Sequence, residues 1–273
     1  MYRLLGVVIT VALILMTRPA QAAPNVDNIA HRGGAGYGPE NTIAACVLSG
    51  RQGANMCEFD VQQTKDLELV LIHDQTLNRT TNVEDVYPDR APWRVSDFTL
   101  EEIRRLDAGS WFSSRYQGEG VPTLKQALDN MGGGGPGLLL EVKHSPINPG
   151  IDRRVATELQ ENRSLWVGKR LVLQAFDWKA VRALHRMLPE VPVVVIGKPG
   201  VGQLAELSGY AKGITLPHSG LTPDYIAKVH ERGMRVYTST ANRRPLIRRL
   251  IAYGVDGIMT NRPDRVWAVK RRW

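Results

Sequence analysis

Short apolar runs alternate with amphipathic stretches along most of the chain. Eight runs have the length and composition of buried strands and are bounded by turn residues. They predict strands at residues 28–32, 55–64, 138–143, 171–176, 193–197, 213–217, 235–239 and 257–260. Between them, apolar residues recur at helical spacing near Val155, Val181, Ile226 and Ile247. Gly233 and Gly254 stand where the last two of these helices should end.

Strands that alternate with helices predict a parallel sheet with helical crossovers. Eight such units fit a closed barrel of about 250 residues. A doubly wound open sheet is the competing architecture, but no G-x-G-x-x-G pattern follows the first strand. We therefore expect a (β/α)8 TIM barrel.

One segment, at about residues 75–120, fits the alternation poorly. It is polar, it contains Pro88 and Pro92, and it concentrates aromatic residues: Trp93, Phe98, Trp111, Phe112 and Tyr116. We interpret it as a small insertion after the second strand that folds over one end of the barrel. Its aromatic side chains are expected to form mainly the insertion's own core. Long loops in compact domains usually serve function.

Residues 1–22 have the three-part pattern of a secretory signal peptide. Arg3 precedes an apolar stretch from Leu4 to Met16, and Ala20-Gln21-Ala22 matches a cleavage site. A permanent anchor is the alternative, but the apolar stretch is shorter than the roughly 18 residues that a spanning helix needs. The mature domain is then 23–273, and we expect it to be periplasmic or secreted.

Export would place the two cysteines, Cys46 and Cys57, in an oxidising compartment, where disulfides form and persist. Cys46 falls in an expected helix and Cys57 in the strand that follows. If Glu58 and Asp60 leave one face of that strand, Cys57 leaves the other, toward packed helices. A Cys46–Cys57 disulfide and a pair of buried free thiols both remain open.

Composition and charge exclude several classes of protein. Apolar residues make up 43% of the chain and charged residues 23%, which is ordinary globular composition and argues against general disorder. The net charge is +8, and removal of Arg3 and Arg18 with the leader lowers it by two. Basic clusters occur at 243–244, 248–249 and 270–272, but no nucleic-acid motif accompanies them. We interpret them as solvated surface and expect no nucleic-acid partner.

Acidic residues gather where barrel strands should end, and that end of a barrel carries the active site. Glu58 and Asp60 are two apart on a strand, so both side chains leave the same face. Glu141 comes from the next barrel strand. Like charges this close repel unless a cation or protons compensate. Three carboxylates suit one hard divalent cation, Mg²⁺ or Ca²⁺.

Histidines and cations accompany these carboxylates at the strand ends. His31 and His73 are candidates for a general acid and a general base. Arg32 and Lys143 supply positive charge, and a guanidinium fits phosphate oxygens. Together these groups favour an anionic phosphorus substrate. We assign His185, His218 and His230 to the packed core. The role of His144 is left open.

These residues lie in motifs that resemble the glycerophosphodiester phosphodiesterase family. The resemblance runs through nearly all of the mature chain in the right order, which makes it specific. Its motifs are His31-Arg32-Gly33 with Pro39-Glu40-Asn41-Thr42, Glu58-x-Asp60-Val61-x-x-Thr64-Lys65-Asp66, His73-Asp74-x-Thr76-Leu77-x-Arg79-Thr80-Thr81, Leu106-Asp107-Ala108-Gly109-Ser110-Trp111-Phe112, Val121-Pro122-Thr123-Leu124, Leu140-Glu141-Val142-Lys143 and the run from Gly254 to Pro263.

The resemblance implies a metal-dependent barrel enzyme that hydrolyses glycerophosphodiesters to glycerol 3-phosphate and an alcohol. By position, His31 and His73 match the family's acid–base pair, and Arg32 and Lys143 match its phosphate-contacting cations. Glu40 and Asn41 match a supporting loop. In the family's usual scheme the glycerol 2-hydroxyl attacks phosphorus, and water then opens the cyclic phosphate. The family's metal ligands correspond to Glu58, Asp60 and Glu141.

The chain departs from the family pattern at a few places. Leu67 stands where a Gly is frequent in the hairpin, Ala175-Phe176 replaces Ser-Phe, and 237–240 reads Tyr-Thr-Ser-Thr in place of Trp-Thr-x-Asn. The change at Leu67 alters a turn and leaves the chemistry alone. The change at 237–240 keeps an aromatic residue but alters the wall of the pocket, which leaves substrate preference open.

Two other functions remain as alternatives. One is a barrel phospholipase, of type D or C, that acts on intact lipid or lysolipid. The other is a protein that binds glycerophosphodiesters without cleaving them. The expected partner is a small-molecule substrate. Transient contact with a membrane surface is compatible with the basic charge.

Overall fold

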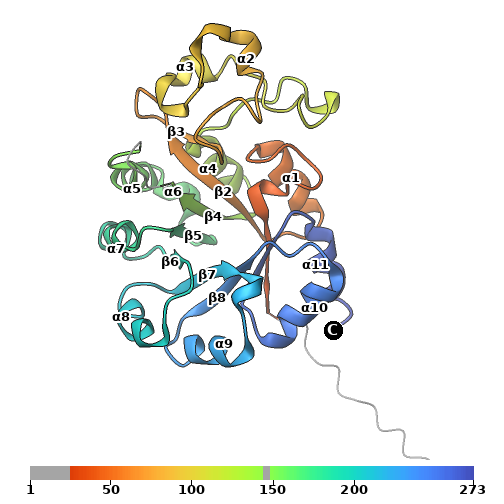
Figure 1. Ribbon diagram of the computed structural model, residues 1–273, viewed down its shortest axis with the longest axis vertical. Coiled ribbons are helices and arrows are strands. Elements are labelled where there is room, and N and C mark those ends of the chain that lie inside the picture. Colours follow the sequence, from red (N-terminus) through yellow and green to blue (C-terminus); the bar gives the residue numbers. More distant parts are fainter. Residues whose placement is uncertain (1–24, 144–147) are drawn as a thin grey trace, which may run out of the picture.

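The computed structural model describes residues 25–143 and 148–273. Eight parallel strands form a closed ring with helices around it (Figure 1). The strands of the ring are β1 (Asp27–Ala30), β2 (Met56–Gln63), β4 (Gly137–Val142), β5 (Leu171–Ala175), β6 (Val193–Ile196), β7 (Gly213–Pro217), β8 (Arg235–Ser239) and β9 (Gly257–Thr260). Their order around the ring follows the chain, and pairing of β1 with both β9 and β2 closes it. The expected (β/α)8 barrel is confirmed.

Two details differ from the expected strands. A further strand, β3 (Leu69–Leu71), runs antiparallel to β2 and stands outside the ring. The first strand ends at Ala30 instead of residue 32, because η1 (His31–Gly33) turns the chain away with Arg32 at a φ of 51°. His31 therefore lies just beyond the end of its strand.

Helices cover the outside of the ring. They are α1 (Ile43–Arg51), α4 (Leu124–Gly132), α5 (Ile151–Glu161), α6 (Arg163–Trp166), α7 (Trp178–Met187), α8 (Leu204–Leu207), α9 (Pro223–His230), α10 (Arg244–Tyr253) and α11 (Pro263–Lys270), with the short turns η5 (Val201–Gln203) and η6 (His218–Gly220). Gly254 ends α10 in the left-handed conformation, as expected from its position. No helix within the described residues has the length and apolarity to cross a bilayer.

The period of two along each strand divides the side chains between two environments. Outward side chains of the strands form one large apolar cluster with the helices. Inward side chains form a closed layer inside the ring: Ile29, Met56, Leu139, Val172, Val194, Tyr237 and Met259. Gly257 leaves room for this layer, since a Cβ there would lie 2.5 Å from the Tyr237 ring. The barrel interior is therefore filled below the level at which its polar residues begin.

The segment after β3 forms a separate lobe at one end of the molecule (Figure 1). It contains only short elements: α2 (Val83–Val86), η2 (Pro88–Arg90), η3 (Val95–Asp97), α3 (Leu100–Ile103) and η4 (Ser114–Tyr116). Phe98 is buried in an apolar cluster of this lobe, and Trp93 packs against that cluster. Trp111 is 42% exposed, although its indole N–H bonds to the Ala108 carbonyl. Most of the lobe's aromatic residues thus serve its own packing.

Candidate active site

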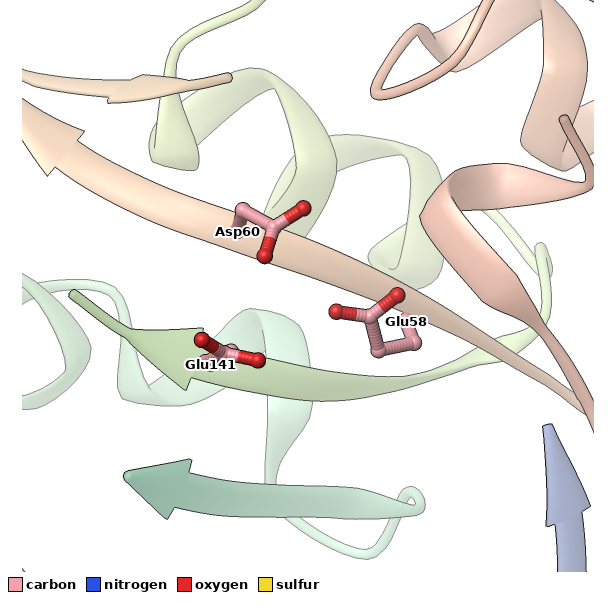
Figure 2. Close-up of side chains that lie close together, drawn as sticks. All are labelled: Glu58, Asp60 and Glu141. Carbon is pink, nitrogen blue, oxygen red and sulfur yellow. The ribbon is translucent and has the colours of Figure 1, made fainter. Parts of the chain in front are cut away.

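Three carboxylates converge at the end of the barrel where the strands finish. Glu58 and Asp60 occupy successive inward positions of β2, and Glu141 pairs in register with Asp60 from β4 (Figure 2). One oxygen of each residue lies within 4.8 Å of one oxygen of both others. All three side chains are buried. The two-residue spacing and the strand register therefore bring the three predicted ligands to one point.

Burial and mutual repulsion act on these carboxyls in different ways. Burial, followed by the charges of Asp60 and Glu141, raises the pKa of Glu58 well above its ordinary value. Burial and Asp60 likewise raise the pKa of Glu141. Burial also opposes ionisation of Asp60, but Lys143, His73 and Asn41 outweigh it and lower its pKa. Positive neighbours thus outweigh burial at Asp60, whereas burial and like charge prevail at Glu58 and Glu141.

The neighbours of Asp60 explain this asymmetry. Lys143 Nζ lies 2.9 Å from Asp60 Oδ1 and 2.5 Å from Glu141 Oε1. Asn41 donates from Nδ2 to Asp60 Oδ2 at 2.9 Å, and the Asp60 backbone N–H donates to Asn41 Oδ1 at 3.0 Å. Arg32 Nε approaches Asp60 Oδ2 at 3.8 Å.

The cluster fits a hard divalent cation. Glu58 accepts a hydrogen bond, at 2.7 Å, from the Arg32 backbone N–H. Burial and two neighbouring carboxylates disfavour its ionised form, which a bound cation would stabilise. Oxygen ligands from three carboxylates are what Mg²⁺ and Ca²⁺ prefer. Within the described residues, these three alone form a cluster of ligand-bearing side chains close enough to hold a metal.

His31 stands beyond the end of β1. Its Nδ1 lies 2.7 Å from Asn261 Oδ1, which follows β9. Because an amide oxygen only accepts hydrogen bonds, Nδ1 carries the proton and Nε2 is left with its lone pair. Burial lowers the pKa of His31 from its ordinary 6.5, against the opposing effect of the bond to Asn261.

His73 follows β3 and differs from His31 in its partner. Its Nδ1 lies 2.7 Å from a carboxylate oxygen of Asp74. The backbone at this point is held by Gln62, an inward residue of β2, whose amide donates to the carbonyls of Ile72, His73 and Asp74. A carboxylate partner stabilises positive charge on an imidazole that takes up a proton.

A pocket of about 440 Å³ opens beside these groups. Its lining includes Gln62, His73, Glu141, Lys143, Asn148 and Phe176. Phe176 follows β5 and is 67% exposed, so an apolar ring stands at the rim. A larger cavity of about 910 Å³ lies between the β2–β3 turn and α5, away from the carboxylates and the two histidines.

Reasoning from sequence missed several polar residues of the site. Gln62 is the next inward residue after Asp60 on β2, and Gln174 on β5 pairs in register with Glu141. The alternation of side chains along each strand could have identified both residues as inward-facing. Asn261 lies within the recognised C-terminal run, but nothing in the sequence indicates that it pairs with His31, which is 230 positions away.

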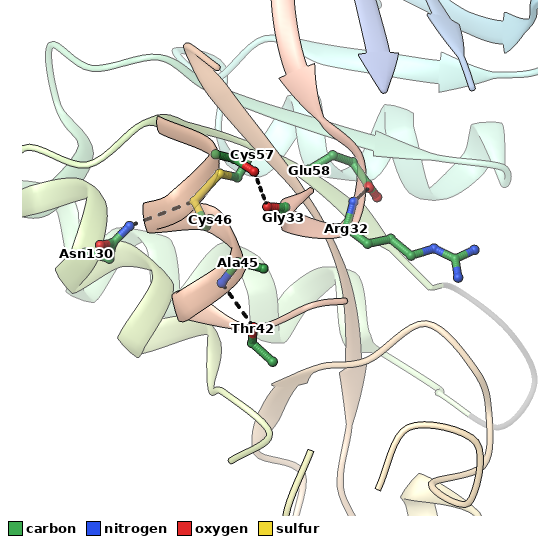
Figure 3. The surroundings of a disulfide bond; sticks show 9 residues. Arg32, Gly33, Thr42, Ala45, Cys46, Cys57, Glu58 and Asn130 are labelled. Atoms are coloured by element: carbon green, nitrogen blue, oxygen red, sulfur yellow. Dashed lines mark hydrogen bonds between the residues drawn. A yellow bond between two sulfur atoms is a disulfide. The ribbon is translucent and has the colours of Figure 1, made fainter. Parts of the chain in front are cut away.

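The two cysteines meet on the outer side of β2. Cys46 of α1 and Cys57 of β2 are joined by a disulfide, with their Cα atoms 5.8 Å apart (Figure 3). Cys57 neighbours Glu58 on the strand but leaves the opposite face. The bond therefore ties α1 to the strand that carries two of the three carboxylates.

The remaining histidines and the basic clusters lie elsewhere. The assignment of three histidines to the core is wrong: His185 and His218 are half-buried, and His230 is exposed, where it bonds to Asp256. His144 and the leader 1–22 lie outside the described residues. The side chains of Arg243, Arg244, Arg248 and Arg249 are exposed, which accords with solvated charge.

The mouth of this barrel is suited to an anionic phosphorus centre, because it places cations and two imidazoles around a cluster able to take a divalent ion. In chemical class the protein is a phosphoric diester hydrolase, and the comparisons with known proteins specify the family. Residues 31–265 match the model of the glycerophosphoryl diester phosphodiesterase family. The chain belongs to this family.

Individual relatives agree with the family match. The chain is 37% identical over 241 residues to the Bacillus subtilis (strain 168) protein YhdW. The match covers 86% of this chain and 94% of YhdW. It is 32% identical to a glycerophosphodiester phosphodiesterase of Caldanaerobacter subterraneus subsp. tengcongensis, over 89% of this chain and 97% of that protein. It resembles the structure of the Oleispira antarctica phosphodiesterase OLEI02445 in complex with the product sn-glycerol-3-phosphate, with a TM-score of 0.78, 28% identity and coverage of 88% and 95%.

Removal of divalent ions should expose the cost of the uncompensated carboxylates. We expect Mg²⁺ or Ca²⁺ at a hundredfold its Kd to raise the free energy of unfolding of EDTA-treated protein by about 2.7 kcal/mol. The gain should be smaller at pH 5 than at pH 8, because raised pKa values let protons compete for Glu58 and Glu141. Thermal unfolding measures both effects. Glu58→Gln should lose most of the gain, and equal gains in this variant and the wild type would contradict the site.

Loss of the disulfide should destabilise the domain without changing its chemistry. For a cross-link between residues 11 apart, the chain-entropy model gives about 3 kcal/mol. We expect the double variant Cys46→Ala/Cys57→Ala to lose roughly this free energy of unfolding in denaturant titrations and to keep its turnover. Reductant should weaken the wild type and leave the variant unchanged. Two alkylatable thiols in the non-reduced mature protein would exclude the bond.

Proposed function

We propose that the protein hydrolyses glycerophosphodiesters to sn-glycerol 3-phosphate and an alcohol. One divalent cation, Mg²⁺ or Ca²⁺, is held by Glu58, Asp60 and Glu141, and His31 and His73 transfer the protons. The observation that carries this proposal is the state of the two imidazoles: each has Nδ1 tied to a side-chain oxygen, which leaves Nε2 for a substrate. The product named in the Oleispira structure supports the choice of substrate.

Substrate binding rests on positive charge at the mouth. The Lys143 ammonium and the Arg32 guanidinium each lie beside the cluster and are partly exposed, so a phosphodiester can reach them. When bound, the divalent ion supplies charge neutralisation and polarises the phosphoryl oxygens. Preorganised charges of this kind are usually the largest contribution to catalysis.

The partners of the two histidines assign their roles. His31 is held in one tautomer by an amide, and its pKa is lowered by burial, so it is neutral near pH 7 and suited to act as the base. His73 has a carboxylate on Nδ1, which stabilises the cationic ring needed by an acid. We infer that His31 accepts the proton of the attacking hydroxyl and that His73 donates a proton to the leaving alcohol.

The reaction then runs in two displacements. In the first, the glycerol 2-hydroxyl loses its proton to His31 and forms a bond to phosphorus, while the bond to the leaving alcohol breaks and His73 protonates that oxygen. In the second, water gives a proton to the now neutral His73 and attacks the cyclic phosphate, and His31 returns its proton to the departing glycerol oxygen. A tethered hydroxyl can have an effective molarity of up to about 10⁵–10⁸ M.

We also propose that the chain is exported and acts in the periplasm or outside the cell. The leader pattern of residues 1–22 supports this location, and so does the disulfide, since such bonds persist in oxidising compartments. Glycerophosphodiesters are small and polar, so a substrate of this class is available to an exported enzyme without membrane insertion.

Replacement of either histidine should remove turnover. We expect His31→Ala and His73→Ala each to lower kcat by about 10²–10⁴-fold, the usual contribution of acid–base catalysis, while the fold is retained. Release of glycerol 3-phosphate from soluble diesters measures the loss, and circular dichroism checks folding. Near-normal release by either variant would refute the assignment.

The same assay distinguishes the alternative functions. Cleavage of intact lipid in vesicles, without cleavage of deacylated diesters, would instead indicate a barrel phospholipase. Equilibrium binding of diesters without product in Mg²⁺ and in Ca²⁺ would indicate a binding protein.

The pH profile should report the base. Because the pKa of His31 is lowered from 6.5, its lone pair stays available in mildly acidic solution, and the acidic limb of kcat/KM should have its midpoint below pH 6.5. Activity is then lost as the pH falls through that midpoint. Initial rates between pH 4 and 8, with free metal kept saturating at every pH, test this, and a midpoint above 6.5 would contradict the role of His31.

A further inference from the structure

Arg79 connects two carboxylates that belong to different parts of the fold. Its Nη1 and Nη2 donate to Glu40 Oε2 and Oε1 at 2.9 and 2.6 Å, in a two-pronged contact. Its Nε donates to Asp74 Oδ2. Glu40 lies between η1 and α1, Asp74 follows β3, and Arg79 itself belongs to the inserted lobe. The three nitrogen atoms of one planar guanidinium are thus divided between two acidic partners.

The first partner leads to His73. Asp74 uses its other oxygen, Oδ1, to hold His73 Nδ1 at 2.7 Å. The bond from Arg79 is the main cause that lowers the pKa of Asp74 to about 2, so this carboxylate stays ionised next to the imidazole. Rotation of Asp74 would release the ring, and Arg79 opposes that rotation.

The second partner leads to Arg32. Glu40 Oε1 accepts from Arg32 Nη1 at 2.9 Å as well as from Arg79. Burial opposes ionisation of Glu40, but Arg79 and Arg32 outweigh it and lower its pKa. Glu40 therefore holds the Arg32 guanidinium at one end, while Arg32 Nε faces Asp60 at the other.

The backbone around Arg79 is fixed from the lobe. Leu77 is fully buried in the lobe's apolar cluster, and Thr80 and Thr81 are buried on the other side of Arg79. The Arg79 side chain is itself 42% exposed, and exposed ion pairs contribute little to stability. A two-pronged contact joined to a second carboxylate serves geometry better than stability.

We propose that Arg79 is a positioning residue through which the inserted lobe aligns His73 and Arg32 on the same phosphodiester. This inference rests on the proposed function, in which His73 protonates the leaving alcohol and Arg32 binds phosphate. It gives the lobe a catalytic task that does not require any of its residues to touch the substrate.

Arg79→Ala tests the proposal against a matched control. Arg90 belongs to the same lobe and likewise joins two partners, the Glu102 carboxylate and the Asp97 carbonyl, without reaching the site. We expect Arg79→Ala to lower kcat by about 10–100-fold, as losses of supporting contacts typically do, and to raise KM. Arg90→Ala should keep both constants within about twofold of the wild type, a difference worth only ~0.4 kcal/mol. Millimolar guanidinium should restore part of the kcat of Arg79→Ala and leave Arg90→Ala unchanged.

Substitutions at the two partners separate the two effects. Asp74→Asn should act mainly on kcat, and Glu40→Gln mainly on KM. In the double variant Arg79→Ala/Asp74→Asn the loss in kcat should be smaller than the product of the single losses, because both changes remove one contact path. Losses that multiply, or equal losses in the Arg79 and Arg90 variants without rescue, would overturn the proposal.

A readout without turnover keeps this test separate from the proposed function. The ¹⁵N resonances of the His73 ring, observed in the folded protein without substrate, should change in Arg79→Ala and stay unchanged in Arg90→Ala. An unchanged ring in Arg79→Ala would refute the positioning role. A wild type that releases no glycerol 3-phosphate would refute the proposed function, whereas the response of the ring would still decide the role of Arg79.

Discussion

Three buried carboxylates facing one another are the constraint on which the site depends. Like charges at such distances in a protein interior are unfavourable unless other charges compensate them. The chain compensates Asp60 with Lys143 and Asn41, and leaves Glu58 with one backbone hydrogen bond. Because this compensation is incomplete, the site favours a bound cation. The positive side chains beside the carboxylates are those that a phosphodiester needs.

The architecture around this cluster keeps it in place. Below it, an apolar layer with Tyr237 fills the barrel, so the carboxylates cannot relax inward. Outside it, the disulfide joins β2 to α1 one residue away from Glu58. In η1, Arg32 has a positive φ of 51°, and this backbone directs its N–H to Glu58. Strain of this kind persists only where the surroundings determine the conformation.

The inserted lobe shows how a segment with its own core can serve a site on another body. Its apolar cluster also takes in Val70 of β3 and Ile72, and its charged contact with the site passes through Arg79. This contact links the lobe to His73 and Arg32, whereas His31 is held by Asn261 from the barrel. The exposed Phe176 belongs to the barrel, so the lobe and the barrel both border the approach to the pocket.

Much of this protein follows from its sequence alone. The apolar runs determined the eight strands to within a few residues, because burial on both faces requires continuous apolar segments. The two-residue spacing determined that Glu58 and Asp60 share a face, and the order of motifs determined the family. Ring closure between the first strand, β1, and the last, β9, and the pairing of His31 with Asn261 were decided by tertiary structure. The contact of Arg79 with Glu40, 39 positions away, was also decided by tertiary structure, since these distant segments meet only when the strands curve into a ring.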